Sequence, residues 1–255
     1  MALELVTIPC LTDNYAYLIR DSATGQTAVV DVPEAPPILA ELTLRGWQLD
    51  KIFLTHHHSD HIQGTQDLVE ATGAAVYGAQ SDMHRLPPLT RALKEGDELT
   101  VGETIGRVID VSGHTIGDIA FLFPSAHLAF TADSLMAGAC GRLFEGSPAV
   151  MWASLCKLAA LPAQTVICSG HEYTASNLRF AATIEPENVE LAARIARVAL
   201  ARAAGVPTVP SLLSEELATN PFLRVKLPHV KEAFGMPDAT DAEVFAAMRA
   251  RKDTF

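Results

Sequence analysis

One stretch decides how this sequence is interpreted: Lys51-Ile-Phe-Leu-Thr-His-His-His-Ser-Asp-His61. It opens with the apolar pattern of a buried strand, and the histidines follow at once. On extended backbone, residues two apart face the same side, so we expect His56 and His58 to point together and His57 to point away. Asp60 and His61 add a carboxylate and an imidazole just beyond. The stretch therefore predicts a strand that delivers two pairs of metal ligands.

Neither pair completes a hydrolytic metal site, because such a zinc ion typically has three protein ligands and a water molecule. Further candidates lie just beyond the ends of other predicted strands: His114, Asp133 and His171. A glycine immediately precedes each of these two histidines. Because all three share this placement, we expect them at the same rim as the histidine run. A chance run of surface histidines is the alternative, and it would not explain the matching positions downstream.

Apolar periodicity and turn residues divide the chain into two parts. We predict an α/β body over residues 1–170 and a helical domain over 171–255. The predicted strands are 3–8, 15–20, 27–31, 51–55, 75–77, 104–110, 119–123, 127–131 and 165–168. The predicted helices are 36–45, 64–72, 150–160, 174–184, 187–204 and a last one from 240 to about 252, where Thr240 and Glu243 form a capping-box pattern.

Composition excludes several classes of function. The 255 residues carry a net charge of −11, which argues against non-specific nucleic-acid binding. The sequence shows neither a membrane span nor a secretory signal. Its four cysteines are scattered without a CxxC pair, so we expect free thiols and a cytoplasmic protein. Oligomeric state is not encoded in the pattern, and we expect a monomer.

The motifs together resemble the glyoxalase II family, the hydroxyacylglutathione hydrolases, within the metallo-β-lactamase superfamily. The HxHxDH signature at a strand end is specific for the superfamily. The narrower match rests on segments spread over nearly the whole chain: Thr12–Tyr15, Gly113–Thr115, Asp133, Gly141–Gly146, Gly170–Thr174, Asn220–Arg224 and Arg251–Phe255.

This resemblance implies an αββα sandwich followed by a C-terminal helical domain. It implies two divalent metal ions, zinc first and iron or manganese as alternatives. The implied ligands of one metal are His56, His58 and His114, and those of the other are Asp60, His61 and His171. Asp133 would bridge both. The implied reaction is hydrolysis of an S-(2-hydroxyacyl)glutathione, S-D-lactoylglutathione to D-lactate and glutathione, by a metal-bridging hydroxide, as the second step of methylglyoxal detoxification.

An acidic protein needs a local basic site to hold a substrate that carries carboxylates. Arg249 and Lys252 lie three residues apart on the last predicted helix, hence on one face. The resemblance implies that they form a glutathione-carboxylate clamp with Tyr173 and Arg142. A basic last turn that complements the helix dipole is the alternative. Departures from the family pattern are Ala132 for a common glycine, Ala139 in a Gly-Cys pair, Arg142 for lysine and Phe144 for tyrosine, and the last two bear on substrate affinity.

Chemistry favours a thioester over an amide substrate. Coordination by metals lowers the pKa of water from 15.7 to about 7, which makes a nucleophile at neutral pH. A thiol with a pKa of about 8.5 can leave as thiolate without a general acid, whereas an amine cannot. Two alternatives stay open: another enzyme of the superfamily, such as a glutathione persulfide dioxygenase, and a non-catalytic metal-binding protein. A β-lactamase or lactonase fits the C-terminal basic pair less well.

Overall fold

The computed structural model describes residues 3–255, and their contacts group into two units. The first unit holds the chain up to Asp110 together with Ile116–Ala132, and the second holds Val111–Thr115 with Asp133–Phe255. Within residues 3–255, no helix combines the length and the apolar character that crossing a bilayer requires. The division into domains at residue 170 stays a prediction, since the contact units follow packing and interleave along the chain.

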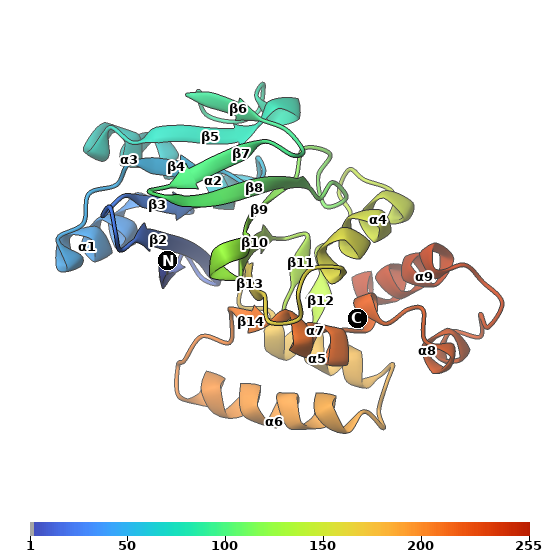
Figure 1. The fold of residues 1–255 in the computed structure, drawn as a ribbon. Coiled ribbons are helices and arrows are strands. Elements are labelled where there is room, and N and C mark those ends of the chain that lie inside the picture. The colour runs from blue at the N-terminus through green and yellow to red at the C-terminus, as the bar shows by residue number, and fades with distance from the viewer. Residues whose placement is uncertain (1–2) are drawn as a thin grey trace. The chain divides into compact units, whose positions relative to one another are not determined.

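A six-stranded sheet lies in the first unit (Figure 1). The first three strands pair antiparallel, and the third strand also begins a parallel set with the remaining three. The strands, in spatial order, are β1 Leu3–Cys10, β2 Asn14–Asp21, β3 Thr27–Val30, β4 Lys51–Phe53, β5 Ala75–Ala79 and β6 Arg91–Leu93. Since parallel strands need crossover connections, α1 (Ala35–Arg45) and α3 (Thr65–Thr72) join them.

Helices and further strands cover the two faces of this sheet. Ile38 and Leu68, from α1 and α3, belong to one buried cluster with residues of the sheet such as Ile52. The other face meets an antiparallel set, β7 Glu98–Val101, β8 Thr104–Asp110, β9 Ile119–Phe123 and β10 Leu128–Ala132. The rings of Phe53 and Phe121 lie 5.2 Å apart across this interface. The first unit is therefore a helix–sheet–sheet stack with an apolar core between layers.

The second unit is mainly helical. In it α4 (Pro148–Ala159) packs against α9 (Asp241–Asp253), and α5 (Thr174–Ala182) packs against α6 (Val189–Ala203). Leu178 and Leu191 lie in the buried cluster between the latter pair. The unit's remaining elements are β11 Leu135–Met136, β12 Ala139–Cys140, β13 Val166–Ser169, β14 Ser211–Leu212, α7 Leu213–Thr219 and α8 Pro228–Ala233.

The predicted strands and helices are all present, with shifts at their ends. Helix α4 begins at Pro148 because the side chain of Ser147 accepts a hydrogen bond from the Val150 backbone and caps the helix. The strands that the sequence did not predict are β6, β7, β11, β12 and β14. The helices that it did not predict are α2 (Ser59–Ile62), α7 and α8, together with three 3-10 turns, Gln80–Asp82, Pro124–Ala126 and Pro221–Leu223. These elements are too short to show a hydrophobic period.

Candidate metal centre

The predicted ligands of the first unit follow the ends of two neighbouring parallel strands. Because β3 and β4 run parallel, their C-terminal ends meet at one edge of the sheet. Asp31 follows β3, and the histidine run follows β4. The run is not a continuation of the strand: β4 ends at Phe53, and α2 begins at Ser59. The edge thus presents a short irregular segment and then one helical turn.

Four predicted ligands gather on this segment. The His56 Nε2 atom lies 3.1 Å from His58 Nδ1, and the rings of His56 and His61 have centroids 4.2 Å apart. His61 Nε2 lies 3.9 Å from an Asp60 carboxylate oxygen. His56 and His61 are buried, whereas His58 and Asp60 are partly exposed. The first unit therefore brings both predicted pairs together.

Buried polar groups fix which nitrogen each imidazole presents. The Asp31 carboxylate accepts hydrogen bonds from the backbone N–H and the hydroxyl of Thr55, and it lies 2.8 Å from His61 Nδ1. Since the Thr55 hydroxyl proton goes to Asp31, its oxygen accepts from His56 Nδ1 at 3.0 Å. Both rings are thus protonated at Nδ1 and present the Nε2 lone pair, the arrangement usual for metal-binding histidines.

Sequence reasoning missed Asp31, Thr55 and Asn14 as parts of this site. Asp31 ends a predicted strand, so the rim argument that selected His114 would also have selected it. Its donor atoms lie within 4.8 Å of those of His56 and His61, but its oxygens already accept three hydrogen bonds. Asp31 therefore orients ligands. Asn14 donates its side-chain amide to the Asp60 carboxylate at 3.0 Å.

His57 contacts a different carboxylate from those near the predicted ligands. Its Nδ1 contacts the buried Asp82 carboxylate at 2.9 Å, and the same carboxylate pairs with Arg85. These contacts hold the middle of the histidine run to the turn that follows β5.

The second unit brings together three more predicted ligands. His114 Nε2 and His171 Nε2 lie 3.5 and 3.4 Å from the same Asp133 carboxylate oxygen. All three side chains are buried. His114 Nδ1 lies 2.7 Å from the backbone carbonyl of Arg142, which again leaves Nε2 as the presented nitrogen. The carboxylate therefore faces both imidazoles.

Two glycines permit the close approach of backbone around these groups. A Cβ on Gly141 would lie 2.2 Å from the Asp133 carbonyl oxygen, and one on Gly113 would lie within 2.7 Å of Met151. Ala132, which stands where glycine is common in the family, has a φ of 40°. This is the left-handed region that glycine adopts without strain, so the family's preference has a backbone cause.

Aromatic rings flank the histidines of the second unit. Tyr173 stacks on His171 with centroids 4.7 Å apart, and Phe144 meets His114 edge-on at 5.3 Å. Both aromatic side chains are partly open to solvent. They place aromatic surface beside two of the predicted metal ligands.

Three of the four predicted clamp residues, Arg142, Arg249 and Lys252, lie in one charged cluster, whereas Tyr173 stacks on His171. Asp253 pairs with Arg142 at 3.4 Å and with Arg249 at 3.0 Å. Burial, together with the positive charge of Arg249, lowers the pKa of Lys252 to about 8. Arg249 itself is buried, and it donates to the Cys140 carbonyl at 2.8 Å. The Arg249 side chain therefore binds the backbone at Cys140, and a direct contact between this side chain and a substrate stays a prediction.

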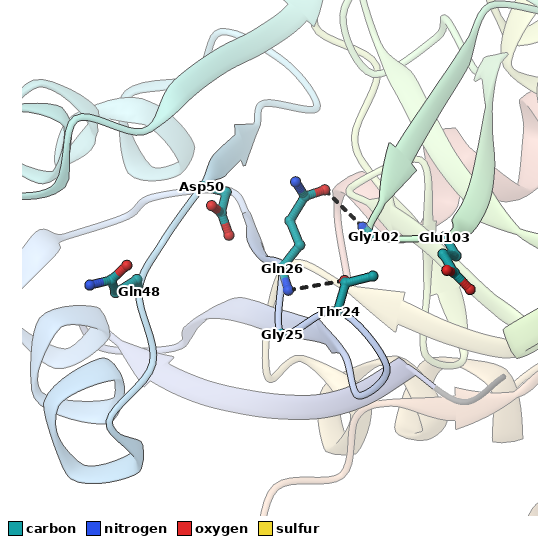
Figure 2. A pocket seen from close by; sticks show the side chains of 7 residues that line it. All are labelled: Thr24, Gly25, Gln26, Gln48, Asp50, Gly102 and Glu103. Carbon is teal, nitrogen blue, oxygen red and sulfur yellow. Dashed lines mark hydrogen bonds between the residues drawn. The ribbon is translucent and has the colours of Figure 1, made fainter.

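A polar pocket of about 470 Å³ lies at the opposite ends of β3 and β4. Figure 2 shows Gln26 at its centre, accepting a hydrogen bond from the Gly102 backbone. Its lining residues are Thr24, Gly25, Gln26, Gln48, Asp50, Gly102 and Glu103. None of these is a predicted ligand, and the pocket is no part of the candidate centre.

The two donor clusters fit divalent metal ions. Each combines buried imidazole nitrogens with carboxylate oxygens, a donor set that suits zinc, iron and manganese. Hydrogen bonds to Nδ1 orient the rings of His56, His61 and His114, as expected of metal ligands rather than of histidines that only pack.

Comparison with known proteins decides the family. The model of the metallo-beta-lactamase superfamily matches residues 11–171, and that of the hydroxyacylglutathione hydrolase C-terminus matches residues 172–255. A protein of Cereibacter sphaeroides named hydroxyacylglutathione hydrolase is 62% identical over 255 residues, which is the full length of both chains. The chain belongs to the hydroxyacylglutathione hydrolases. This family consists of thioester hydrolases, and its αββα fold with a helical C-terminal region is the one that the sequence predicted.

A further curated relative shares this family name, and two solved structures share the fold. A protein of Ruegeria pomeroyi with the same name is 58% identical over the full length of both chains. Among solved structures, ETHE1 from Myxococcus xanthus has a TM-score of 0.65 at 24% identity and covers 100% of this chain and 99% of its own. TTHA1623 in a di-iron-bound form has a TM-score of 0.58 at 29% identity, covering 66% of this chain and 91% of its own.

Proposed function

We propose that this protein hydrolyses the thioester of S-(2-hydroxyacyl)glutathiones, with S-D-lactoylglutathione giving D-lactate and glutathione as the second step of methylglyoxal detoxification. The observation that carries the proposal is the full-length similarity, 62% identical, to proteins named hydroxyacylglutathione hydrolase. The two clusters of oriented imidazoles and carboxylates support it.

We further propose a two-metal centre with the ligands that the family resemblance implies. His56, His58 and His114 would bind one ion, Asp60, His61 and His171 the other, and Asp133 both. The side-chain geometry within each unit supports this assignment, and so does the di-iron-bound state named for TTHA1623. Zinc is the first candidate, and iron or manganese would suit the same donors.

The chain's own residues hold and orient the reacting groups. When bound, the metals would supply Lewis-acid polarisation of the carbonyl and a water-derived nucleophile at neutral pH. Asp31 and Thr55 keep their histidines in one tautomer, and Asn14 fixes the Asp60 carboxylate. The departing thiolate, with a thiol pKa of about 8.5, needs no proton donor.

Substrate binding falls to the charged cluster and its aromatic neighbours. We propose that Arg142 and Lys252 attract the glutathione carboxylates, that Tyr173 lies against the substrate, and that Arg249 completes the clamp. The partial exposure of Arg142 and Lys252 supports direct contact, whereas the buried Arg249 supports an indirect contribution. We also propose a cytoplasmic monomer that binds neither nucleic acid nor membrane, and the four free thiols fit a reducing compartment.

Thioester turnover, measured with the metal content of the same sample, tests the function. We expect S-D-lactoylglutathione to be cleaved by protein that holds about two metals, and we expect His56→Ala to lower kcat by several orders of magnitude. His84→Ala changes an exposed histidine and is the matched control. Metal-replete protein that leaves the thioester intact would contradict the proposal.

Two outcomes would favour the alternatives. Oxygen consumption with glutathione persulfide would indicate a persulfide dioxygenase. About two bound metals with no turnover of any thioester would indicate a non-catalytic metal-binding protein.

A further inference from the structure

A short hairpin connects to the donor groups of the second unit. It comprises β11 and β12, residues 135–140, and it follows Asp133 almost directly. Just beyond the hairpin, Gly141 N–H donates to the Asp133 carbonyl at 2.8 Å. The next carbonyl, that of Arg142, is the partner of His114 Nδ1. Displacement of the hairpin would therefore move Asp133 and release the ring of His114.

His171 is connected to the same hairpin. The hydroxyl of Ser169, two residues earlier on the chain, donates to the Leu135 carbonyl at 3.3 Å. The hairpin strands have two residues each, and an isolated two-stranded hairpin is at best marginally stable. Its position must therefore be set by groups outside it.

Side chains from the helical region hydrogen-bond to almost every residue of the hairpin. Asn220 donates its amide to the carbonyls of Ala139 at 2.9 Å and Met136 at 3.3 Å. The Asn177 amide donates to the Ala137 carbonyl at 3.0 Å, and the Arg249 guanidinium donates to the Cys140 carbonyl at 2.8 Å. The Glu216 carboxylate accepts from the Gly138 N–H at 2.7 Å. Four side chains from three segments that are distant in the sequence thus converge on five of the six hairpin residues.

The anchoring side chains are themselves held in place. Asn220 and Glu216 are fully buried. Asn220 accepts from Phe222 N–H at 3.1 Å, while Glu216 is paired with Arg194 and accepts from the hydroxyl of Ser211. Loss of an anchor would leave hairpin carbonyls buried without a donor, which costs more than a solvent-exposed hydrogen bond.

We propose that Asn220, Asn177 and Glu216 are positioning residues for the metal centre, acting through the 135–140 hairpin. The C-terminal helical region then sets metal affinity, in addition to any contact it makes with substrate. The inference rests on the proposed function to the extent that Asp133, His114 and His171 are metal ligands.

Comparison of two asparagine variants tests the proposal. Asn188 makes bonds of the same kind as Asn220: its oxygen accepts a backbone N–H, that of Leu191, and its amide donates to one carbonyl, that of Ala218, where the Asn220 amide donates to two. Neither bond of Asn188 reaches the hairpin. We expect Asn220→Ala to weaken zinc affinity, measured on the full chain by competition with a chelator, by about tenfold relative to Asn188→Ala, the low end for groups that orient metal ligands.

Asn177→Ala provides a milder variant, because it removes a single bond to the hairpin. It should also weaken zinc affinity and lower kcat with KM nearly unchanged, and it decides the matter should Asn220→Ala not fold. Zinc affinities equal to that of Asn188→Ala, or a rise in KM alone, would overturn the proposal. Wild-type protein that binds zinc without cleaving the thioester would instead overturn the proposed function, since zinc affinity is measured without substrate.

Discussion

Asp31 illustrates how one buried carboxylate can orient two of the proposed metal ligands. It lies against His61 Nδ1 and, through the Thr55 hydroxyl, fixes His56 as well. An amide in its place would have a single acceptor oxygen, which cannot serve all three of these donors, so the hold on the His61 ring would weaken. The residue's effect is thus exerted through two histidines.

The corresponding prediction concerns Asp31→Asn. We expect a 10- to 100-fold loss of metal affinity or of kcat, the usual consequence of removing a carboxylate that orients a metal-binding histidine. The matched control is Asp21→Asn, which alters another buried carboxylate that accepts backbone N–H groups, at a turn of the first unit. Asp21→Asn should lower the free energy of unfolding and leave metal affinity unchanged. Equal metal affinity in the two variants would show that Asp31 only stabilises the fold.

At the scale of elements, helix α9 places cations close together. Arg249 is held by the Cys140 carbonyl and by Asp253, and its charge, added to burial, lowers the pKa of the neighbouring Lys252 to about 8. The charge of Asp253 acts in the opposite direction, and that of Arg142 acts in the same direction as Arg249. Lys252 therefore loses its proton within a pH range that experiments can reach.

This shift predicts pH-dependent substrate binding. As pH rises from 7 to 9, the affinity for a non-hydrolysable glutathione thioether should fall by about two- to fivefold, the range for a partly exposed ion pair. Lys252→Arg keeps its charge throughout and should remove the dependence. Titration calorimetry at several pH values measures both proteins. An equal pH dependence in the variant would exclude Lys252 as the contact.

The same shift has the opposite consequence for stability. In the unfolded chain Lys252 keeps its proton up to about pH 10.4, whereas in the folded chain it loses the proton near pH 8. Between these values the unfolded state binds more protons, so this group makes the folded state more stable as pH rises. Urea unfolding at pH 7.5 and 9.5 should show a smaller gain in the free energy of unfolding for Lys252→Arg than for the wild-type protein.

At the scale of the whole molecule, metal binding should contribute to folding. The proposed ligands converge only in the folded chain, so metal binds the native state in preference to the unfolded one. At a free metal concentration 100 times Kd, a single ion would add about 2.7 kcal/mol to the free energy of unfolding. We therefore expect chelation to lower Tm by roughly 5–10 °C for a chain of this size.

Zinc added back to chelated protein should restore the Tm, as measured by scanning calorimetry. His84→Ala should behave as the wild-type protein does, and His56→Ala should recover less. An identical Tm with and without metal would contradict the idea that these side chains form a metal centre in the native state.

Patterns along the chain were enough to predict most of the strands, the long helices and several polar residues that follow them. An apolar run that stops at a polar cluster places that cluster at a sheet edge, and His56, His114 and His171 were selected in this way. The motifs spread along the chain also predicted the family, and the full-length relatives confirm that prediction. These features are local, since each depends on residues close together in sequence.

Only the tertiary structure decided which side chains orient the ligands and what Arg249 contacts. Asp31 meets His61 across 30 positions of sequence, and Arg249 meets Cys140 across 109. A hydrogen bond between such residues leaves no period or motif in the chain, because it depends on how distant strands and helices pack. The sequence by itself determined the donors at the strand ends, and packing determined how they are held.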